Sequence, residues 1–270
     1  MPQYDPVLTQ PASDSAIVVS DLAKSYGAVE AVKGVSFAVR TGTTTALLGG
    51  NGAGKTTTLS MLLGVLTPSA GSITVLGEDM PAHRCRVLPR MNFTSPYVDL
   101  PKRLTVAQNL SVFADLYGLR RARQRIAEVA EDCDLTALLK RSYGSLSAGQ
   151  RTRVSLAKAV LNEPKVLLLD EPTASLDPDV GDRMRTYLER YQRRTGCTML
   201  LASHHMGEVE RMCDDVIMLR EGKVVDQGSP QQLLARYGRE NMEEVFLDVA
   251  RGRTDERVPG GAAVETGVNA

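Results

Sequence analysis

The stretch LLGGNGAGKTTT, residues 47–58, restricts the possible folds of this chain more than any other feature. It matches the pattern G-x-x-x-x-G-K-[ST], with the fixed positions at Gly49, Gly54, Lys55 and Thr56. The composition of TTTALL at residues 43–48 predicts a buried strand before the loop, and a helix is predicted from about Thr56. A strand, a glycine-rich loop and a helix in this order predict an α/β fold whose loop cradles phosphate groups.

The chemistry of the loop indicates a nucleoside triphosphate with Mg²⁺. Glycines let several backbone N–H groups approach a concentrated negative charge, and the helix dipole adds to the attraction. We expect Lys55 to neutralise the β and γ phosphates and Thr56 to ligate Mg²⁺. The expected phosphate-binding residues are Gly49, Asn51, Gly52, Ala53, Gly54, Lys55, Thr56 and Thr57.

A second motif, KVLLLDEPTASLDPD at residues 165–179, predicts a buried parallel strand that ends in Asp170 and Glu171. Ligands of parallel sheets gather at the carboxyl ends of the strands. We therefore expect Asp170 to act on Mg²⁺ and Glu171 to polarise a water for attack on the γ-phosphate. An acidic pair at a strand end is usually only solvated, and its position after a phosphate loop makes it a candidate site.

A third stretch, TMLLASHHMGEVE at residues 198–210, predicts another buried strand, followed by Ser203, His204 and His205. A histidine after a strand is more often structural or exposed than catalytic. Here we expect His204 at the same sheet edge as Asp170, within reach of the γ-phosphate. His205 is expected to be structural or exposed.

The remaining pattern predicts an α/β core with an antiparallel β part and a helical insertion. Short β-type runs between residues 16 and 40 predict an antiparallel sheet, and apolar residues near a period of 3.6 predict helices over 104–162. Residues 228–238 predict a short helix with Ser229 as its N-cap. The expected domains are a loose tail over 1–15, an ATPase domain over 16–235 with helices inserted at about 96–160, and a C-terminal helix and disordered tail over 236–270.

Composition excludes some classes of function. The 32 Lys and Arg residues balance 32 Asp and Glu residues, which argues against a large basic surface for nucleic acid. The four cysteines lack CxxC spacing, and we interpret them as reduced thiols of a cytosolic protein. No apolar run has the length of a membrane span, and the N-terminus does not have the pattern of a signal segment.

Together with these motifs, the stretch SLSAGQ (145–150) makes residues 17–235 resemble the ATP-binding subunit of ABC transporters. The resemblance implies a P-loop NTPase (RecA-like) core, ATPase activity, and a signature loop formed by Ser147, Ala148, Gly149 and Gln150. In that family the signature loop binds the γ-phosphate of ATP held by a second subunit, so two copies of this chain are expected to sandwich two ATP molecules. This role explains a loop of small residues and bare N–H groups.

The resemblance assigns other positions and exposes two departures. Tyr26 would stack on adenine, although a tyrosine at a sheet edge is nearly as plausible, and Asp177 would communicate between the two ATP sites. Ala148 replaces a glycine of the usual signature but keeps its N–H group. Ser95 stands where the family holds a glutamine that touches Mg²⁺ and water, and because a serine is shorter and could reach only through water, no role is assigned to it.

The segment NMEEVFLDVA (241–250) looks like the C-terminal helix of an exporter subgroup whose members serve a separate permease. The resemblance therefore implies export and a peripheral position on the inner face of the cell membrane. In the loop at residues 95–103, Tyr97 and Leu100 are candidates for an apolar patch that contacts the permease, and a plain connecting loop is equally plausible. A non-transport ABC ATPase acting on ribosomes or DNA, and a binding module without activity, are the alternatives.

Overall fold

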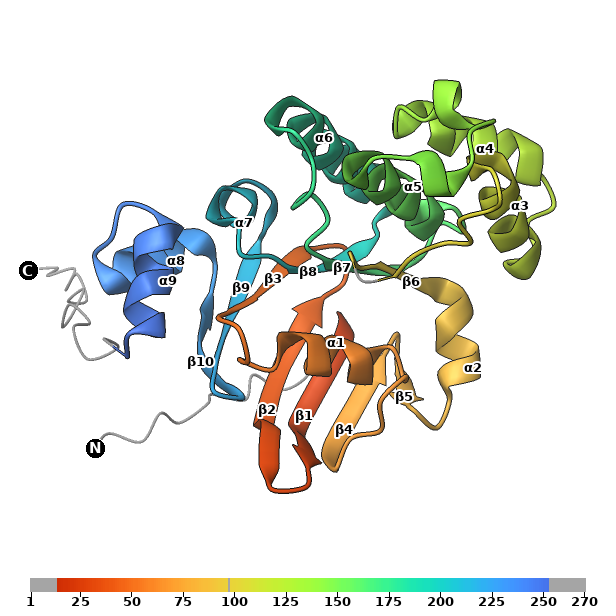
Figure 1. Ribbon diagram of the computed structural model, residues 1–270. Helices are drawn as coiled ribbons and strands as arrows, with labels where there is room; N and C mark the ends of the chain where they lie inside the picture. Colours follow the sequence, from red (N-terminus) through yellow and green to blue (C-terminus); the bar gives the residue numbers. More distant parts are fainter. Residues whose placement is uncertain (1–13, 97, 253–270) are drawn as a thin grey trace, which may run out of the picture.

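A six-stranded, mostly parallel sheet forms the centre of the structure (Figure 1), a computed structural model that describes residues 14–96 and 98–252. Its strand order is β10-β9-β3-β8-β7-β6. Only the β10–β9 pair is antiparallel. The strands are β3 (Thr44–Gly49), β6 (Met91–Thr94), β7 (Val166–Asp170), β8 (Thr198–Ala202), β9 (Asp215–Arg220) and β10 (Lys223–Gly228).

The central strands are mostly apolar because both faces of the sheet are buried. Side chains alternate between two cores along each strand. In β7, Leu167 and Leu169 pack into one core, and Val166 and Leu168 pack into the other. β3, β8 and β9 alternate in the same way. The buried strands predicted from the sequence are confirmed.

A smaller antiparallel sheet lies below the central one in Figure 1, with α1 (Lys55–Leu62) beside it. Its strands follow the order β2-β1-β4-β5. They are β1 (Ser15–Tyr26), β2 (Val29–Arg40), β4 (Ala70–Val75) and β5 (Glu78–Met80). This sheet, α1 and one face of the central sheet share a single core, in which Ile17 and Leu62 are fully buried. The antiparallel β part predicted near residues 16–40 is confirmed and extends to β4 and β5.

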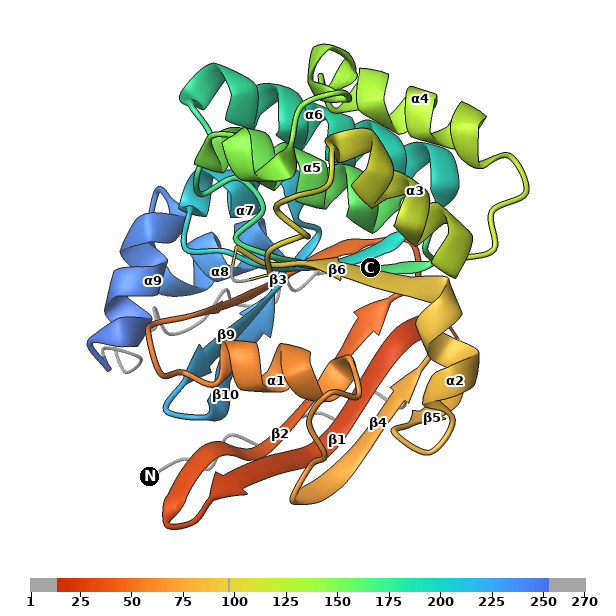
Figure 2. The same cartoon turned by 45° about the vertical axis from the view of Figure 1, so that its right-hand side comes forward.

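Helices cover the opposite face of the central sheet. Figures 1 and 2 both show α3 to α6 on that side, with α1 on the other. The helices after α1 are α2 (Arg84–Val87), α3 (Val106–Leu116), α4 (Ala122–Asp132), α5 (Ala148–Val160), α6 (Pro178–Thr195), α7 (Met206–Met212), α8 (Pro230–Tyr237) and α9 (Met242–Ala250). The region expected to be a helical insertion, about 96–160, contains α3, α4 and α5.

Polar side chains define where several of these helices begin. Thr105, Ser147 and Ser229 each accept a hydrogen bond from the backbone N–H three residues later, and the glutamine at that position bonds back to the cap. α8 ends at Gly238, whose φ of 61° suits glycine. The helix predicted over 228–238 is therefore confirmed.

The predicted tails fall largely outside the described residues, at 1–13 and 253–270. The first tail was predicted to extend through residue 15, but β1 already begins at Ser15. The short C-terminal helix expected within 241–250 corresponds to α9. Within residues 14–96 and 98–252, every helix is too short or too polar to cross a lipid bilayer.

Candidate functional site

Four loops meet at one edge of the central sheet because their strands are parallel neighbours. The loop at residues 50–54 follows β3, and Ser95 follows β6. Asp170 ends β7 and pairs with Ala202, the last residue of β8, while the β6–β7 register brings Ser95 level with Asp170. His204 lies two residues beyond the end of β8. The candidate residues from the sequence motifs therefore converge at the carboxyl edge of the sheet.

The loop before α1 requires glycine at two positions. A Cβ on Gly49 would lie 2.6 Å from the carbonyl oxygen of Leu219 and 2.7 Å from Cβ of Ala53. Gly54 has a φ of 101°, and its Cβ would lie 2.8 Å from the carbonyl oxygen of Ala31. Both positions press the loop against β9 and β2, and this packing fixes the path of its backbone.

Lys55 places its amine inside the loop. Its Nζ donates hydrogen bonds to the carbonyl oxygens of Gly49 and Gly50, the latter at 3.2 Å. Burial lowers the pKa of Lys55, and the charges of Glu171 and Asp170 oppose that shift. The amine is therefore within electrostatic reach of both carboxylates. Thr56 is exposed at the start of α1, and Thr57 is half-buried.

Asp170 is only 9% exposed at the end of β7. Burial raises the pKa of Asp170, while the hydrogen bond from Ser95 and the charge of Lys55 lower it. The hydroxyl of Ser95 donates directly to Oδ2 of Asp170 at 3.1 Å. Ser95, to which the sequence assigned no role, thus contacts the carboxylate itself.

Glu171 and His204 form a close polar pair at the sheet edge. Oε1 of Glu171 lies 2.6 Å from Nδ1 of His204. The backbone of Glu171 has a φ of 49°, and its N–H donates to the carbonyl oxygen of Ala202 at 2.8 Å. The Glu171 side chain is 19% exposed and that of His204 is 70% exposed. The neighbouring His205 is exposed, and its N–H donates to the hydroxyl of Ser203.

Sequence reasoning missed Glu208, which is 1% exposed and bonds to Ser203, the residue before His204. Its carboxylate accepts hydrogen bonds from the hydroxyls of Thr173 and Ser203, the latter at 2.8 Å, and lies 3.4 Å from Nη1 of Arg185. It therefore ties the loops that follow β7 and β8 to α6. The signal was present as a glutamate in the first turn of α7, but an acid there is equally expected from the helix dipole.

The signature loop forms the start of α5. The hydroxyl of Ser147 accepts from the N–H of Gln150 at 3.3 Å, and Oε1 of Gln150 accepts from the N–H of Ser147 at 3.0 Å. A Cβ on Gly149 would lie 3.0 Å from the carbonyl oxygen of Ser175. Ser147 and Ala148 are exposed. The loop thus packs beside the segment that leads to α6, on the face of the central sheet away from α1 (Figures 1 and 2).

Asp177 and Tyr26 are both exposed. Asp177 occupies the N-cap position of α6, and its backbone carbonyl oxygen accepts a hydrogen bond from the N–H of Gly181 at 2.8 Å. Tyr26 ends β1, is 51% exposed, and has Nζ of Lys24 5.4 Å from its ring centre. Tyr26 pairs with Val29 of β2. Ala31, two residues further along β2, lies against Gly54 of the phosphate loop.

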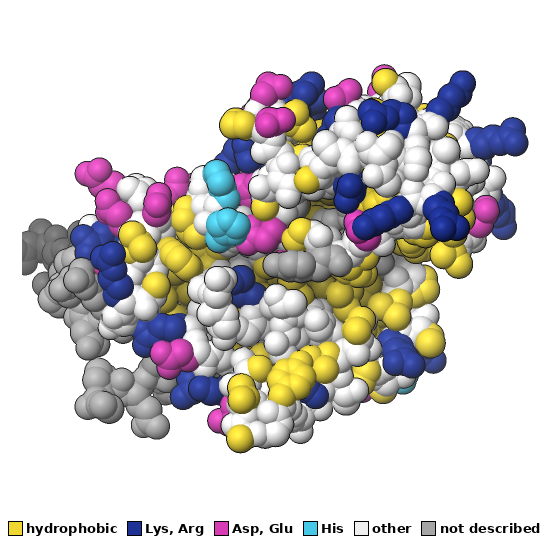
Figure 3. Space-filling view, in the orientation of Figure 1, with side chains coloured by type: hydrophobic (Ala, Val, Ile, Leu, Met, Phe, Trp, Pro, Cys, Tyr) yellow, Lys and Arg dark blue, Asp and Glu magenta, His cyan; other side chains and the backbone are white. Residues whose placement is uncertain are grey.

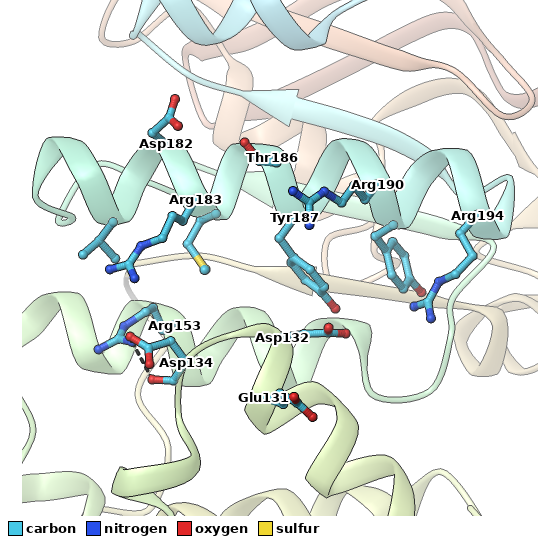
Figure 4. A pocket seen from close by; sticks show the side chains of 13 residues that line it. Glu131, Asp132, Asp134, Arg153, Asp182, Arg183, Thr186, Tyr187, Arg190 and Arg194 are labelled. Carbon is cyan, nitrogen blue, oxygen red and sulfur yellow. Dashed lines mark hydrogen bonds and ion pairs between the residues drawn. The ribbon is translucent and has the colours of Figure 1, made fainter.

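Two cavities help to delimit the site. One, of about 730 Å³, lies between α6 and the pair α4 and α5 (Figure 4), and its lining includes none of the site residues predicted from the sequence. A second, of about 250 Å³, is lined by the phosphate loop from Gly50 to Ala53 and by Phe246 and Val249 of α9. The candidate site is therefore the open sheet edge, flanked by α9.

Comparison with known proteins agrees with this arrangement. Residues 32–174 match the family model described as ABC transporter. The Nod factor export ATP-binding protein I of Ralstonia nicotianae (strain ATCC BAA-1114 / GMI1000) is 37% identical over 242 residues, covering 87% of this chain and 74% of the relative. The corresponding protein of Burkholderia orbicola (strain AU 1054) is 39% identical over 217 residues, covering 78% of this chain and 70% of the relative.

Solved structures with the same fold include an ATP-binding subunit of an ABC transporter, with a TM-score of 0.81 and 26% identity over 87% of this chain and 99% of that chain. Another is cbiO1 from Clostridium perfringens, part of the transporter complex cbiONQ, with a TM-score of 0.74 and 30% identity over 89% of this chain and 97% of that chain. A dimeric cassette, MJ0796, shares the fold at 22% identity, with a TM-score of 0.74 over 79% of this chain and 98% of that chain. The chain belongs to the ATP-binding subunits of ABC transporters, and it is a nucleotide-binding ATPase with a P-loop NTPase core.

Proposed function

We propose that this chain hydrolyses MgATP with Glu171 as the general base and His204 as its partner. The observation that carries the proposal is the 2.6 Å contact between Oε1 of Glu171 and Nδ1 of His204. A carboxylate accepts a hydrogen bond, so this contact assigns a proton to Nδ1 of His204. His204 then holds the carboxylate at the sheet edge, where it can take a proton from an attacking water.

The nucleotide is bound by the loop around Lys55. The N–H groups of the loop and the amine of Lys55 offset the charge of the phosphates. The amine already lies inside the loop, where it donates to the carbonyl oxygens of Gly49 and Gly50. Asn51, Gly52, Ala53, Gly54 and Thr57 complete the cradle, and Tyr26 stacks on the base.

The residues present fit Mg²⁺. Thr56 and Asp170 offer oxygen ligands, which this hard cation prefers, and Mg²⁺ typically takes one or two protein ligands together with phosphates and water. In the described part of the chain, no group of three or more His, Cys, Asp or Glu side chains is arranged to hold a metal. The cation would therefore bind with the nucleotide, held by Thr56 and Asp170, and would offset charge on the phosphates.

Each complete site needs a second copy of the chain. The exposed Ser147 and Ala148, with the half-buried Gly149 and Gln150, form a helix N-terminus that suits an anion. This N-terminus belongs to α5, on the opposite face of the central sheet from α1 (Figures 1 and 2). In the proposed dimer the signature loop of one copy contacts the ATP of the other, and Asp177 lies between the two sites.

We also propose that the dimer drives export through a separate permease at the inner face of the membrane. The relatives named as export proteins support the direction of transport. An exposed apolar patch supports the contact: Val112 and Leu116, one turn apart on α3, are 46% and 72% exposed, and Val98 and Leu88 are 41% and 38% exposed. Figure 3 shows hydrophobic side chains gathered where α3 lies above α2 and β6.

This patch differs from the candidate patch at Tyr97 and Leu100. Leu100 is only 5% exposed and packs in the core with the helices of the insertion, so it is not available to a partner. Tyr97 lies outside the described residues. The proposed contact therefore moves from these two residues to α3 and Val98.

The experiment for the catalytic proposal is Glu171→Gln, which keeps the shape of the side chain but removes the base. ATP turnover should fall by roughly 10²–10⁴-fold, while ATP binding persists and an ATP-bound dimer accumulates in sedimentation. Glu163→Gln is the matched control, because Glu163 also has a φ of 49° and its side chain is 60% exposed, away from the catalytic pair. Near-normal turnover of Glu171→Gln would exclude Glu171 as the base.

A further inference from the structure

The contact between Ser95 and Asp170 joins two neighbouring strands at the catalytic edge. Thr94 pairs with Leu169 in the parallel register of β6 and β7, so the next residues, Ser95 and Asp170, come side by side. Oγ of Ser95 donates to Oδ2 of Asp170 at 3.1 Å. Asp170 is 9% exposed, so little water competes with the serine for this oxygen.

The strand that carries Ser95 is itself fixed by buried polar contacts to α5. The hydroxyls of Thr94 and Ser155 lie 2.8 Å apart, and both residues are buried. Nζ of Lys158 donates to Oδ1 of Asn92 at 3.1 Å and to the carbonyl oxygen of Phe93 at 2.9 Å. Ser95 therefore follows directly after a strand whose side chains and backbone are anchored.

We propose that Ser95 is a positioning residue that orients the carboxylate of Asp170 toward the metal of the bound nucleotide. The inference rests on the proposed role of Asp170 as a Mg²⁺ ligand. A carboxylate at a strand end can rotate, and the hydroxyl of Ser95 restrains this rotation by holding one of its two oxygens. Outer hydrogen bonds of this kind typically change metal affinity by about 10–100-fold when they are removed.

The test measures Mn²⁺, a paramagnetic substitute for Mg²⁺, bound to the full chain with ATP in a Glu171→Gln background. Electron paramagnetic resonance reports free Mn²⁺ and needs no turnover. Ser95→Ala should weaken Mn²⁺ binding about 10–100-fold, while ATP binding in EDTA stays unchanged. Ser95→Thr keeps a hydroxyl and should restore Mn²⁺ affinity to within a few-fold of the parent protein.

Ser155→Ala is the matched control, because it removes the neighbouring buried hydrogen bond to Thr94 without touching Asp170. It should lower the melting temperature and leave Mn²⁺ affinity unchanged. Equal losses of Mn²⁺ affinity in Ser155→Ala and Ser95→Ala would overturn the proposal, since the effect would then come from the strand as a whole.

Asp170→Asn separates this inference from the proposed function. If Asp170→Asn loses Mn²⁺ while Ser95→Ala binds it as tightly as the parent protein, Ser95 has no positioning role and the metal site stands. If Asp170→Asn also binds Mn²⁺ normally, the assignment of Asp170 to the metal is wrong, and the proposed positioning role of Ser95 is wrong as well.

Discussion

Lys158 is a cation buried in the interior of the molecule. It is 6% exposed on α5, donates to Asn92 and Phe93, and its Nζ lies 4.9 Å and 5.6 Å from the ring centres of Phe93 and Phe113. Burial lowers the pKa of Lys158 from 10.5 to about 8. The unfolded chain therefore holds this proton more tightly than the folded one.

The free energy of unfolding should consequently rise with pH as Lys158 loses its proton in the folded state. The charged form costs the fold roughly 3 kcal/mol below the folded pKa, and the cost disappears as pH approaches the unfolded pKa. Between about pH 8 and pH 10, the free energy of unfolding of the wild type, measured in urea, should rise by about 2 kcal/mol relative to that of Lys158→Met. Parallel pH profiles for the two proteins would show that Lys158 titrates normally.

At the scale of elements, α3 has two apolar faces. Val106, Leu110 and Ala114 are fully buried against the other helices, whereas Val112 and Leu116 point away from them. A helix at the surface of a monomer needs only one apolar face. The second face is therefore available for the permease.

Val112→Asp combined with Leu116→Asp tests this face. Because both side chains are exposed, the double variant should fold and bind MgATP like the wild type. Co-purification with the permease and transport should be lost, since two charges would be buried at the contact. The control is Val65→Asp, at a residue that is 80% exposed just after α1. Normal transport by the double variant would place the contact elsewhere.

The sequence predicted the elements whose pattern is local. The strands β3, β7, β8 and β9 were readable because most of their residues are apolar, and α8 was readable from Ser229 and Gly238. β6 was missed because its residues, MNFT, include Asn92 and Thr94, which suit the core through distant partners such as Lys158 and Ser155 on α5. β4 was missed because its first three residues, Ala70, Gly71 and Ser72, are exposed and show no alternating apolar pattern.

The candidate site was predictable in its residues but not in its contacts. The motifs identified Lys55, Asp170, Glu171 and His204, because each follows a readable strand. The bond from Ser95 to Asp170 was not readable, since it depends on the register between β6 and β7. The burial of Glu208 depends likewise on three segments that meet only in the folded chain.

At the scale of the whole molecule, the central claim is that each ATP site is shared by two copies. The phosphate loop and the signature loop lie at helix N-termini on opposite faces of one sheet, at α1 and α5. A second copy related by two-fold symmetry would bring each signature loop to the other copy's phosphate loop. Two identical sites would then form together.

Mixing two inactive variants tests this claim most directly. Lys55→Ala damages the phosphate loop, and Ser147→Arg damages the signature loop, so each variant alone has no intact site and should not hydrolyse ATP. A heterodimer has one site with both defects and one with neither. If a single intact site can turn over, an equal mixture should recover about a quarter of wild-type ATPase activity, because half of the dimers are mixed. No recovery in the mixture, or normal activity of Ser147→Arg alone, would contradict the shared site.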